Sequence, residues 1–249
     1  MTYRDHFSTG SAGYARYRPH YPDTLYRWLL EQAPGNRHAV DVATGTGQAA
    51  TGLARHFRRV SAFDLSPSQV RLAEPAPGVS YAAAPAERLP VLDTDADLVT
   101  VAQALHWLDL DAFYAEVRRV LVPGGVLAAW TYDRLQVDPG VDAVIEYFYM
   151  QVVRADWPPE RHHVETGYRE LPFPFARLQA PSFAMRADWT VDDLLGYLGT
   201  WSATRRCHER TGNDPISEIA DDLRRAFGPV RRQVSWPLTV LAGRHGAGV

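Results

Sequence analysis

The sequence contains no lysine, so all 26 of its basic residues are arginine, set against 29 acidic residues for a net charge of -3. Without lysine the chain cannot hold pyridoxal phosphate or a carbonyl substrate as a Schiff base, and it cannot form the phosphate-binding loop whose lysine contacts a nucleotide. The near balance of charge provides no overall attraction toward nucleic acid. We therefore expect neither those enzyme classes nor a nucleic-acid partner.

Cysteine and long apolar runs are also scarce. The single cysteine, Cys207, cannot form a disulfide within the chain. The first ten residues, MTYRDHFSTG, carry charges where a secretory signal needs an apolar segment, and no apolar run reaches the length of a membrane span. We therefore expect a cytoplasmic protein with no membrane partner. At 249 residues, 46% of them hydrophobic, the chain is long enough to bury a full core.

Short apolar runs alternate with helical stretches between His38 and Tyr132, which is typical of parallel strands joined by crossover helices. Strands are expected at 38–43, 60–65, 79–84, 96–103, 126–132, 182–187 and 231–244. Helices are expected at 48–57, 110–121, 142–154, 191–201 and 214–228, and a proline-rich, aromatic stretch over 157–181 reads as irregular. The pattern predicts an α/β fold: a doubly wound, seven-stranded, Rossmann-like sheet with an insertion or cap between strands five and six.

We expect one domain over residues 1–249 with four parts. These are an N-terminal arm and helix (1–35), a ligand-binding core (36–132), a cap region (133–213) and a last helix and strand (214–249).

The stretch DVATGTGQAA (41–50) joins the first expected strand to a helix through a glycine-rich turn. Glycine lets a ligand approach the backbone closely, and the spacing of Gly45, Gly47 and Ala50 fits a dinucleotide fingerprint with alanine at its third position. Asp41 argues against this interpretation, because a carboxylate there would repel a pyrophosphate and attract a cation. An NAD(P)-dependent oxidoreductase stays open as the alternative.

Polar residues follow three of the expected strands: the glycine turn, Asp64, and the segment that starts at Gln103. Ligands of open parallel sheets bind beyond the carboxyl ends of the strands. The two oxygens of Asp64 can accept hydrogen bonds from both hydroxyls of a ribose. Dinucleotide folds use the same device, and Asp64 could also belong to a simple helix-capping turn.

Five motifs in correct order across Ala39–Trp130 resemble the class I S-adenosylmethionine-dependent methyltransferases. The motifs are DVATGTG, FDLSPSQVRLA, AAAPAERLP, DLVTVAQALHW and EVRRVLVPGGVLAAW. The resemblance implies S-adenosylmethionine as cofactor, S-adenosylhomocysteine as product, and a small-molecule acceptor. A protein that binds the cofactor but has lost transfer is a further alternative.

The resemblance also implies the cofactor-binding residues. Within the core they are Asp41, Ala43, Gly45, Thr46, Gly47, Asp64, Leu65, Ala86, Glu87 and Gln103. Members of the family often have a polar side chain that contacts adenine at the position of Pro85. Proline cannot make this contact, so we expect the backbone of Ala86 or Glu87 to make it. The opening stretch YARYRPHYP (14–22) resembles the subgroup of the trans-aconitate methyltransferases, which implies that Tyr14, Tyr17 and Arg18 lie near the methionine end of the cofactor.

The subgroup favours an organic acid carboxylate as acceptor. A carboxylate needs no base, whereas a phenol, alcohol or amine would, and His106 is then the candidate catalytic residue. The candidate acceptor-binding residues are His106, Trp107, Trp201 and Arg205, the last two from GTWSATRRCHER (199–210). No metal is expected at RHHVE (161–165), since adjacent histidines point apart on most backbones.

Overall fold

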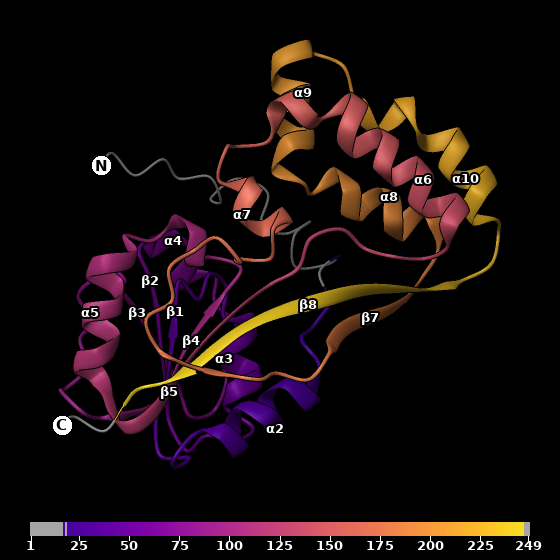
Figure 1. The fold of residues 1–249 in the computed structure, drawn as a ribbon. Coiled ribbons are helices and arrows are strands. Elements are labelled where there is room, and N and C mark those ends of the chain that lie inside the picture. Colours follow the sequence, from indigo (N-terminus) through magenta and orange to yellow (C-terminus); the bar gives the residue numbers. More distant parts are fainter. Residues whose placement is uncertain (1–16, 18, 247–249) are drawn as a thin grey trace. The chain divides into compact units, whose positions relative to one another are not determined.

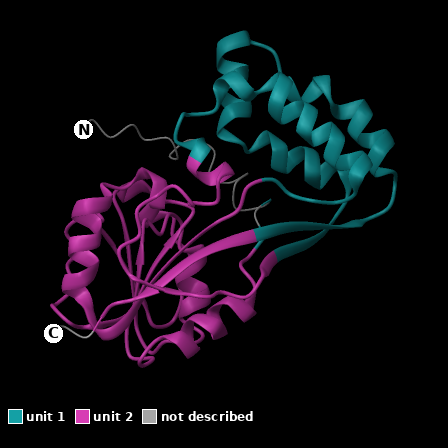
Figure 2. Cartoon of the chain, viewed as in Figure 1, with its two compact units in different colours: residues 1–19, 134–162, 185–237 teal, residues 20–133, 163–184, 238–249 magenta. Residues whose placement is uncertain are grey.

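The computed structural model describes residues 17 and 19–246, which form two compact units (Figures 1 and 2). Unit 2 comprises residues 20–133, 163–184 and 238–249, and unit 1 comprises residues 1–19, 134–162 and 185–237. This division into two units does not test the prediction of a single domain with four parts, which stays a prediction. In the part of the chain described, no helix is both long and apolar enough to cross a membrane.

The sheet confirms the α/β fold but has eight strands, one more than predicted. Their order is β3-β2-β1-β4-β5-β8-β6, and β7 pairs with β8. The strands β1 to β5 pair in parallel with their neighbours, whereas β8 runs antiparallel to both β5 and β6. The bounds are β1 Ala39–Val42, β2 Val60–Asp64, β3 Val79–Ala83, β4 Ala96–Ala102, β5 Leu121–Thr131, β6 Ala176–Leu178, β7 Phe183–Trp189 and β8 Arg232–Arg244.

The additional strand is β6, which lies in the stretch predicted to be irregular. It has only three residues, and none of them is fully buried. So short and exposed a strand carries no alternation of apolar and polar residues by which a sequence reveals it. The strand β5 also begins earlier than predicted, at Leu121, because Pro123–Gly125 continue the strand instead of preceding it.

The core of unit 2 lies on both faces of the sheet. One face packs against α5 (Leu110–Val120) through Phe113, Val117 and Val120, together with Val40 and Val42 of β1. Since successive side chains of a strand point to opposite faces, Asp41 faces the other way. Figure 1 shows α5 on one side of the sheet, and α2 (Asp23–Gln32) and α3 (Gln48–Leu53) on the other. A further short helix, α4 (Pro67–Arg71), follows β2.

Unit 1 is mainly helical. Among its described residues, the α-helices are α6 (Pro139–Tyr147), α8 (Val191–Gly199), α9 (Ser202–Thr211) and α10 (Ala220–Phe227), and α7 (Arg161–Glu165) spans the boundary with unit 2. The predicted helix over 142–154 instead starts at Pro139, capped by Asp138, and passes into a π-helical turn at Phe148–Val152. The predicted helix over 214–228 is a 3-10 turn, Pro215–Glu218, followed by α10. The capping box at Thr190 and Asp193 opens α8.

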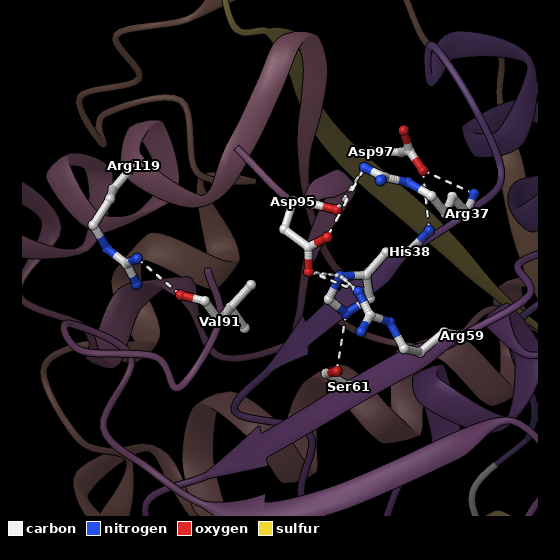
Figure 3. A network of polar contacts seen from close by, with 8 residues as sticks. All are labelled: Arg37, His38, Arg59, Ser61, Val91, Asp95, Asp97 and Arg119. Carbon is white, nitrogen blue, oxygen red and sulfur yellow. Dashed lines mark hydrogen bonds and ion pairs between the residues drawn. The ribbon is translucent and has the colours of Figure 1, made fainter. Parts of the chain in front are cut away.

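A polar network joins the amino ends of β1, β2 and β4 (Figure 3). The buried His38 ring lies 3.0 Å from Asp95 through Nδ1 and 2.9 Å from Ser61 Oγ through Nε2, and Arg59 pairs with Asp95 at 2.6 Å. Burial and the charge of Arg59 lower the pKa of His38, so the ring is neutral. Asp97 accepts hydrogen bonds from the backbone N–H groups of Arg37 and His38.

The order Ser61, His38, Asp95 is that of a hydrolytic triad, but the surroundings differ. Ser61 lies within β2, which pairs on both sides, with Val40 and with Ser80. Its backbone N–H is therefore part of the sheet and cannot stabilise an oxyanion. In addition, Arg59 lies 2.8 Å from Nδ1 of His38 and competes with Asp95 for it. The network fastens the three strands together, at the end of the sheet opposite the glycine turn.

A second polar group supports the loop after Ala86 and Glu87. Arg119 donates to the carbonyls of Leu89 and Val91 and pairs with Glu116 at 2.6 Å. Glu116 in turn accepts from the backbone N–H of Leu89 at 2.6 Å. These bonds tie the loop to α5 and so fix the backbone that leads from β3 toward β4.

Candidate active site

The glycine turn follows β1 with three residues in the left-handed region: Ala43 (φ 54), Gly45 (φ 58) and Gly47 (φ 89). The N–H of Thr44 donates to the carbonyl of Phe63 on β2 at 2.9 Å, and the N–H of Gly47 donates to the carbonyl of Thr44 at 3.0 Å. A positive φ causes little strain in glycine, but it does strain alanine. Such strain gathers at functional sites, and here it lies at the carboxyl end of β1.

The two glycines of the turn have different surroundings. A Cβ atom on Gly47 would lie 2.3 Å from the hydroxyl oxygen of Tyr81, and the φ of 89 would strain any other residue, so the position favours glycine. A Cβ atom on Gly45 would have no atom within 4 Å. The backbone at Gly45 therefore borders open space, as expected of a turn that a ligand approaches.

Asp64 ends β2 and holds the turn in place. Its Oδ2 accepts from the N–H of Gly45 at 2.8 Å, and its Oδ1 accepts from the N–H of Ser66 at 2.8 Å. A carboxylate oxygen can accept more than one hydrogen bond, so ribose hydroxyls can add to these backbone donors. The next residue, Leu65, exposes 48% of its surface.

Asp41 lies deeper than the sequence suggested, since it is completely buried. Its Oδ1 accepts from the hydroxyl of Thr100 at 2.6 Å, and its Oδ2 accepts from the hydroxyl of Thr44 at 2.6 Å. Burial raises the pKa of Asp41 to about 6, although both threonine hydroxyls oppose this shift. The carboxylate is thus ionised at neutral pH, and its complete burial means that its charge, rather than direct contact, is what a ligand at the turn would meet.

Gln103 directly follows β4 and has a positive φ of 60, so a second strained residue lies at the same edge of the sheet as Ala43. Its side chain is bound to β5, since Oε1 accepts from the Thr131 hydroxyl at 2.6 Å and Nε2 donates to the Tyr132 carbonyl at 3.2 Å. Its backbone N–H donates to the Trp130 carbonyl at 2.8 Å, so the backbone carbonyl of Gln103 is the group best placed to contact a cofactor.

The other predicted cofactor residues also lie in unit 2. Thr46, in the turn, accepts from the N–H of Glu74 through its carbonyl. Ala86 is buried, and Glu87 accepts from the N–H of Asp109 at 3.4 Å, near the start of α5. The structure thus brings together, in one unit, the ten residues predicted from the core.

His106 and Trp107 form a 3-10 turn that follows β4. Their rings lie 4.8 Å apart. Nδ1 of His106 lies 3.0 Å from the hydroxyl of Tyr168, a buried residue that the sequence analysis did not single out.

The remaining predicted residues belong to unit 1. Trp201 is only 5% exposed and packs among Phe148, Tyr149 and Trp157, so it has little surface to offer an acceptor. Arg205 is half-buried on α9. The Tyr17 ring packs on α8, close enough to meet a Cβ atom on Gly196 at 2.5 Å. Tyr14 and Arg18 lie outside the described residues.

Sequence reasoning missed Thr44, Thr100 and Tyr168. Thr100 had a signal, because it is the one hydroxyl in the otherwise apolar run LVTVA of β4. Tyr168 had none, since it meets His106 from 62 residues away in the chain. No group of three or more metal-binding side chains occurs within residues 17 and 19–246.

The site fits a ligand that combines an adenosine with a cation. Asp64 suits ribose hydroxyls, the exposed Leu65 suits the apolar face of a base, and the open turn at Gly45 admits close approach. The buried charge of Asp41 favours a cation and disfavours a pyrophosphate. S-adenosylmethionine has an adenosine and a cation without a pyrophosphate, whereas a dinucleotide carries a pyrophosphate that the charge of Asp41 disfavours.

Comparisons with known proteins agree with S-adenosylmethionine as the ligand. The methyltransferase domain family matches residues 40–129. A Dictyostelium discoideum protein named as a methyltransferase is 30% identical over 227 residues, covering 90% of this chain and 86% of the relative. An uncharacterized methyltransferase of Mycobacterium tuberculosis is 33% identical over 185 residues, covering 74% of this chain and 70% of the relative.

A solved structure from Anaeromyxobacter dehalogenans, provisionally described as a type II methyltransferase, is 50% identical and has a TM-score of 0.87. The match covers 91% of this chain and 97% of that one. The oxidoreductase alternative loses its support. The chain belongs to the class I S-adenosylmethionine-dependent methyltransferases, with S-adenosylmethionine as its cofactor.

Proposed function

We propose that the enzyme methylates the carboxylate of a small organic acid. The observation that carries this proposal is a group of arginines around one buried ring in unit 1. The guanidinium groups of Arg134, Arg154 and Arg161 lie 5.0, 5.8 and 5.6 Å from the ring centroid of Tyr149, which is 1% exposed. We call these four residues, with Trp157, the arginine–aromatic cluster.

Three like charges around one ring repel each other, and anions relieve that repulsion. Glu146 pairs with Arg134. Arg161 lies 4.6 Å above the ring of Trp157 and donates to the hydroxyl of Tyr149 at 3.1 Å. The indole N–H of Trp157 is buried and has no hydrogen-bond partner among the described residues. A carboxylate would pair with the arginines and could accept this orphaned N–H.

The chemistry suits such an acceptor. Bound S-adenosylmethionine supplies a methyl group on a sulfonium, and a carboxylate oxygen is already ionised at neutral pH. The protein then needs to align the acceptor and exclude water, without a base. The opening motif that resembles the trans-aconitate methyltransferases also favours an organic acid.

The rival proposal is a protein that keeps the cofactor and performs no transfer. A panel of acids, with their primary amides and alcohols, distinguishes the two. We would incubate the protein with S-adenosylmethionine and succinate, citrate, benzoate or octanoate, and measure the S-adenosylhomocysteine formed. Turnover on acids alone supports the proposal. Turnover on alcohols or amides, or on nothing while the cofactor binds, contradicts it.

Replacing Arg161 by glutamine is expected to raise the KM for the acid roughly tenfold or more, because a hydrogen bond to a charged group is lost. The affinity for S-adenosylmethionine, bound in unit 2, should not change. Trp157→Phe, which keeps a ring and removes the N–H, should raise KM less. Arg225→Gln is the matched control, since Arg225 pairs with Asp222 on α10 with its side chain 75% exposed. Equal KM values in Arg161→Gln and the control would overturn the assignment of the cluster.

A further inference from the structure

The loop after α7 contains two consecutive residues in the left-handed region, Gly167 (φ 61) and Tyr168 (φ 60). Glycine adopts this conformation readily, whereas a bulky aromatic residue there is a true outlier and is strained. The N–H of Tyr168 donates to the carbonyl of His163 at 2.8 Å, which holds the strained backbone in place. Strain of this kind persists where the surrounding structure enforces it and often serves a function.

The strained backbone directs the Tyr168 side chain into the core of unit 2, where it is completely buried. The hydroxyl lies 3.0 Å from Nδ1 of His106, with the two rings 5.7 Å apart. Trp107 also packs against this imidazole, with the ring centroids 4.8 Å apart. His106 is therefore held by a phenol at one nitrogen and by an indole next to its ring.

The position of His106 relates this contact to the reaction. It follows β4 by a few residues, at the edge of the sheet that carries Gln103 and the glycine turn. A neutral imidazole donates from one nitrogen and accepts at the other, so the partner of one nitrogen sets the role of the other.

We propose that Tyr168 is a positioning residue: its hydroxyl donates to Nδ1 of His106, which leaves the proton of the imidazole on Nε2. His106 then presents a hydrogen-bond donor, and not a base, at the carboxyl edge of the sheet. This inference rests on the proposed function, because an ionised carboxylate needs a donor and has no proton to give up. Tyr168 faces His106 from the loop after α7, and Trp107 faces it from its own turn.

The tautomer can be measured without any acceptor. Nitrogen-15 NMR of histidine-labelled protein, saturated with S-adenosylhomocysteine at pH 8, should show His106 protonated at Nε2. In Tyr168→Phe the phenol donor is absent, and the proton should distribute between both nitrogens. A His106 protonated at Nδ1 in the wild type would overturn the inference, whatever the acceptor is.

Activity gives a second readout that a merely structural role would not change. With the acid of highest turnover in the panel above, Tyr168→Phe should lower kcat/KM at pH 8 by about twofold or more, because the form protonated at Nε2 is no longer the one that the phenol selects. The affinity for S-adenosylmethionine should not change. An unchanged kcat/KM at pH 8 contradicts the donor role.

Tyr114→Phe is the matched control, because Tyr114 is a second buried tyrosine of the same core whose hydroxyl donates to the Pro172 carbonyl at 2.6 Å. It should lower the unfolding temperature about as much as Tyr168→Phe while leaving the His106 spectrum and kcat/KM unchanged. If His106 is protonated at Nε2 but no acid is methylated, the role of Tyr168 toward His106 stands and the proposal of a carboxylate acceptor is refuted.

Discussion

Replacing Asp64 by alanine will weaken the binding of S-adenosylmethionine by about 100-fold or more. Each hydroxyl of a ribose that donates to a carboxylate contributes about 1.5–3 kcal/mol, and the variant loses two such bonds. It also loses the two bonds from the N–H groups of Gly45 and Ser66 that fix the glycine turn. Calorimetric titration with S-adenosylmethionine, and separately with S-adenosylhomocysteine, measures the effect.

Two further variants separate recognition from folding. Asp64→Asn keeps one carbonyl oxygen and should bind with intermediate affinity. Asp221→Ala removes an aspartate whose side chain is 86% exposed, and should bind like the wild type. If Asp64→Ala unfolds at a lower temperature but binds within about threefold of the wild type, Asp64 is only a capping residue of the turn.

The affinity for S-adenosylmethionine should fall about tenfold between pH 7 and pH 5, because Asp41 takes up a proton in this range. Burial raises the pKa of Asp41 to about 6 in the cofactor-free protein. The cations of the bound cofactor favour the ionised carboxylate and lower that pKa, so binding releases a proton. A protein that has already protonated Asp41 must give up this proton to bind, and it therefore binds more weakly.

The same shift has an opposite consequence for stability. The folded-state pKa lies above the usual value of 3.8, so the native protein holds this proton more tightly than the unfolded chain. The contribution of Asp41 to the free energy of unfolding therefore rises as pH falls through 6, and at neutral pH the buried charge costs roughly 3 kcal/mol. Asp41→Asn should remove both dependences. Identical pH profiles of affinity in wild type and Asp41→Asn would show that Asp41 does not sense the cofactor.

The sequence was sufficient for the parts of the fold that depend on local patterns. The strands β1, β2 and β4 are nearly continuous apolar runs that end in the glycine turn, Asp64 and Gln103. These features identify a parallel sheet and its ligand-binding edge without reference to any distant residue. The short, exposed strand β6 lacks such a pattern and was missed.

The chemistry of the site was less accessible from the sequence. The position of Asp41 in its motif was clear, but its complete burial depends on Thr100, which lies 59 residues away on β4. Likewise, the sequence identified His106 but left open whether it acts as a base. That role depends on a contact with Tyr168, whose positive φ no local pattern predicts.

A crystal structure of the protein with S-adenosylhomocysteine tests the central claim most directly. The account predicts both ribose hydroxyls within hydrogen-bond distance of the Asp64 carboxylate, the adenine against Leu65, and the backbone of Gly45 next to the ligand. An S-adenosylhomocysteine molecule bound away from the carboxyl ends of β1 and β2, or with its ribose turned from Asp64, would contradict it.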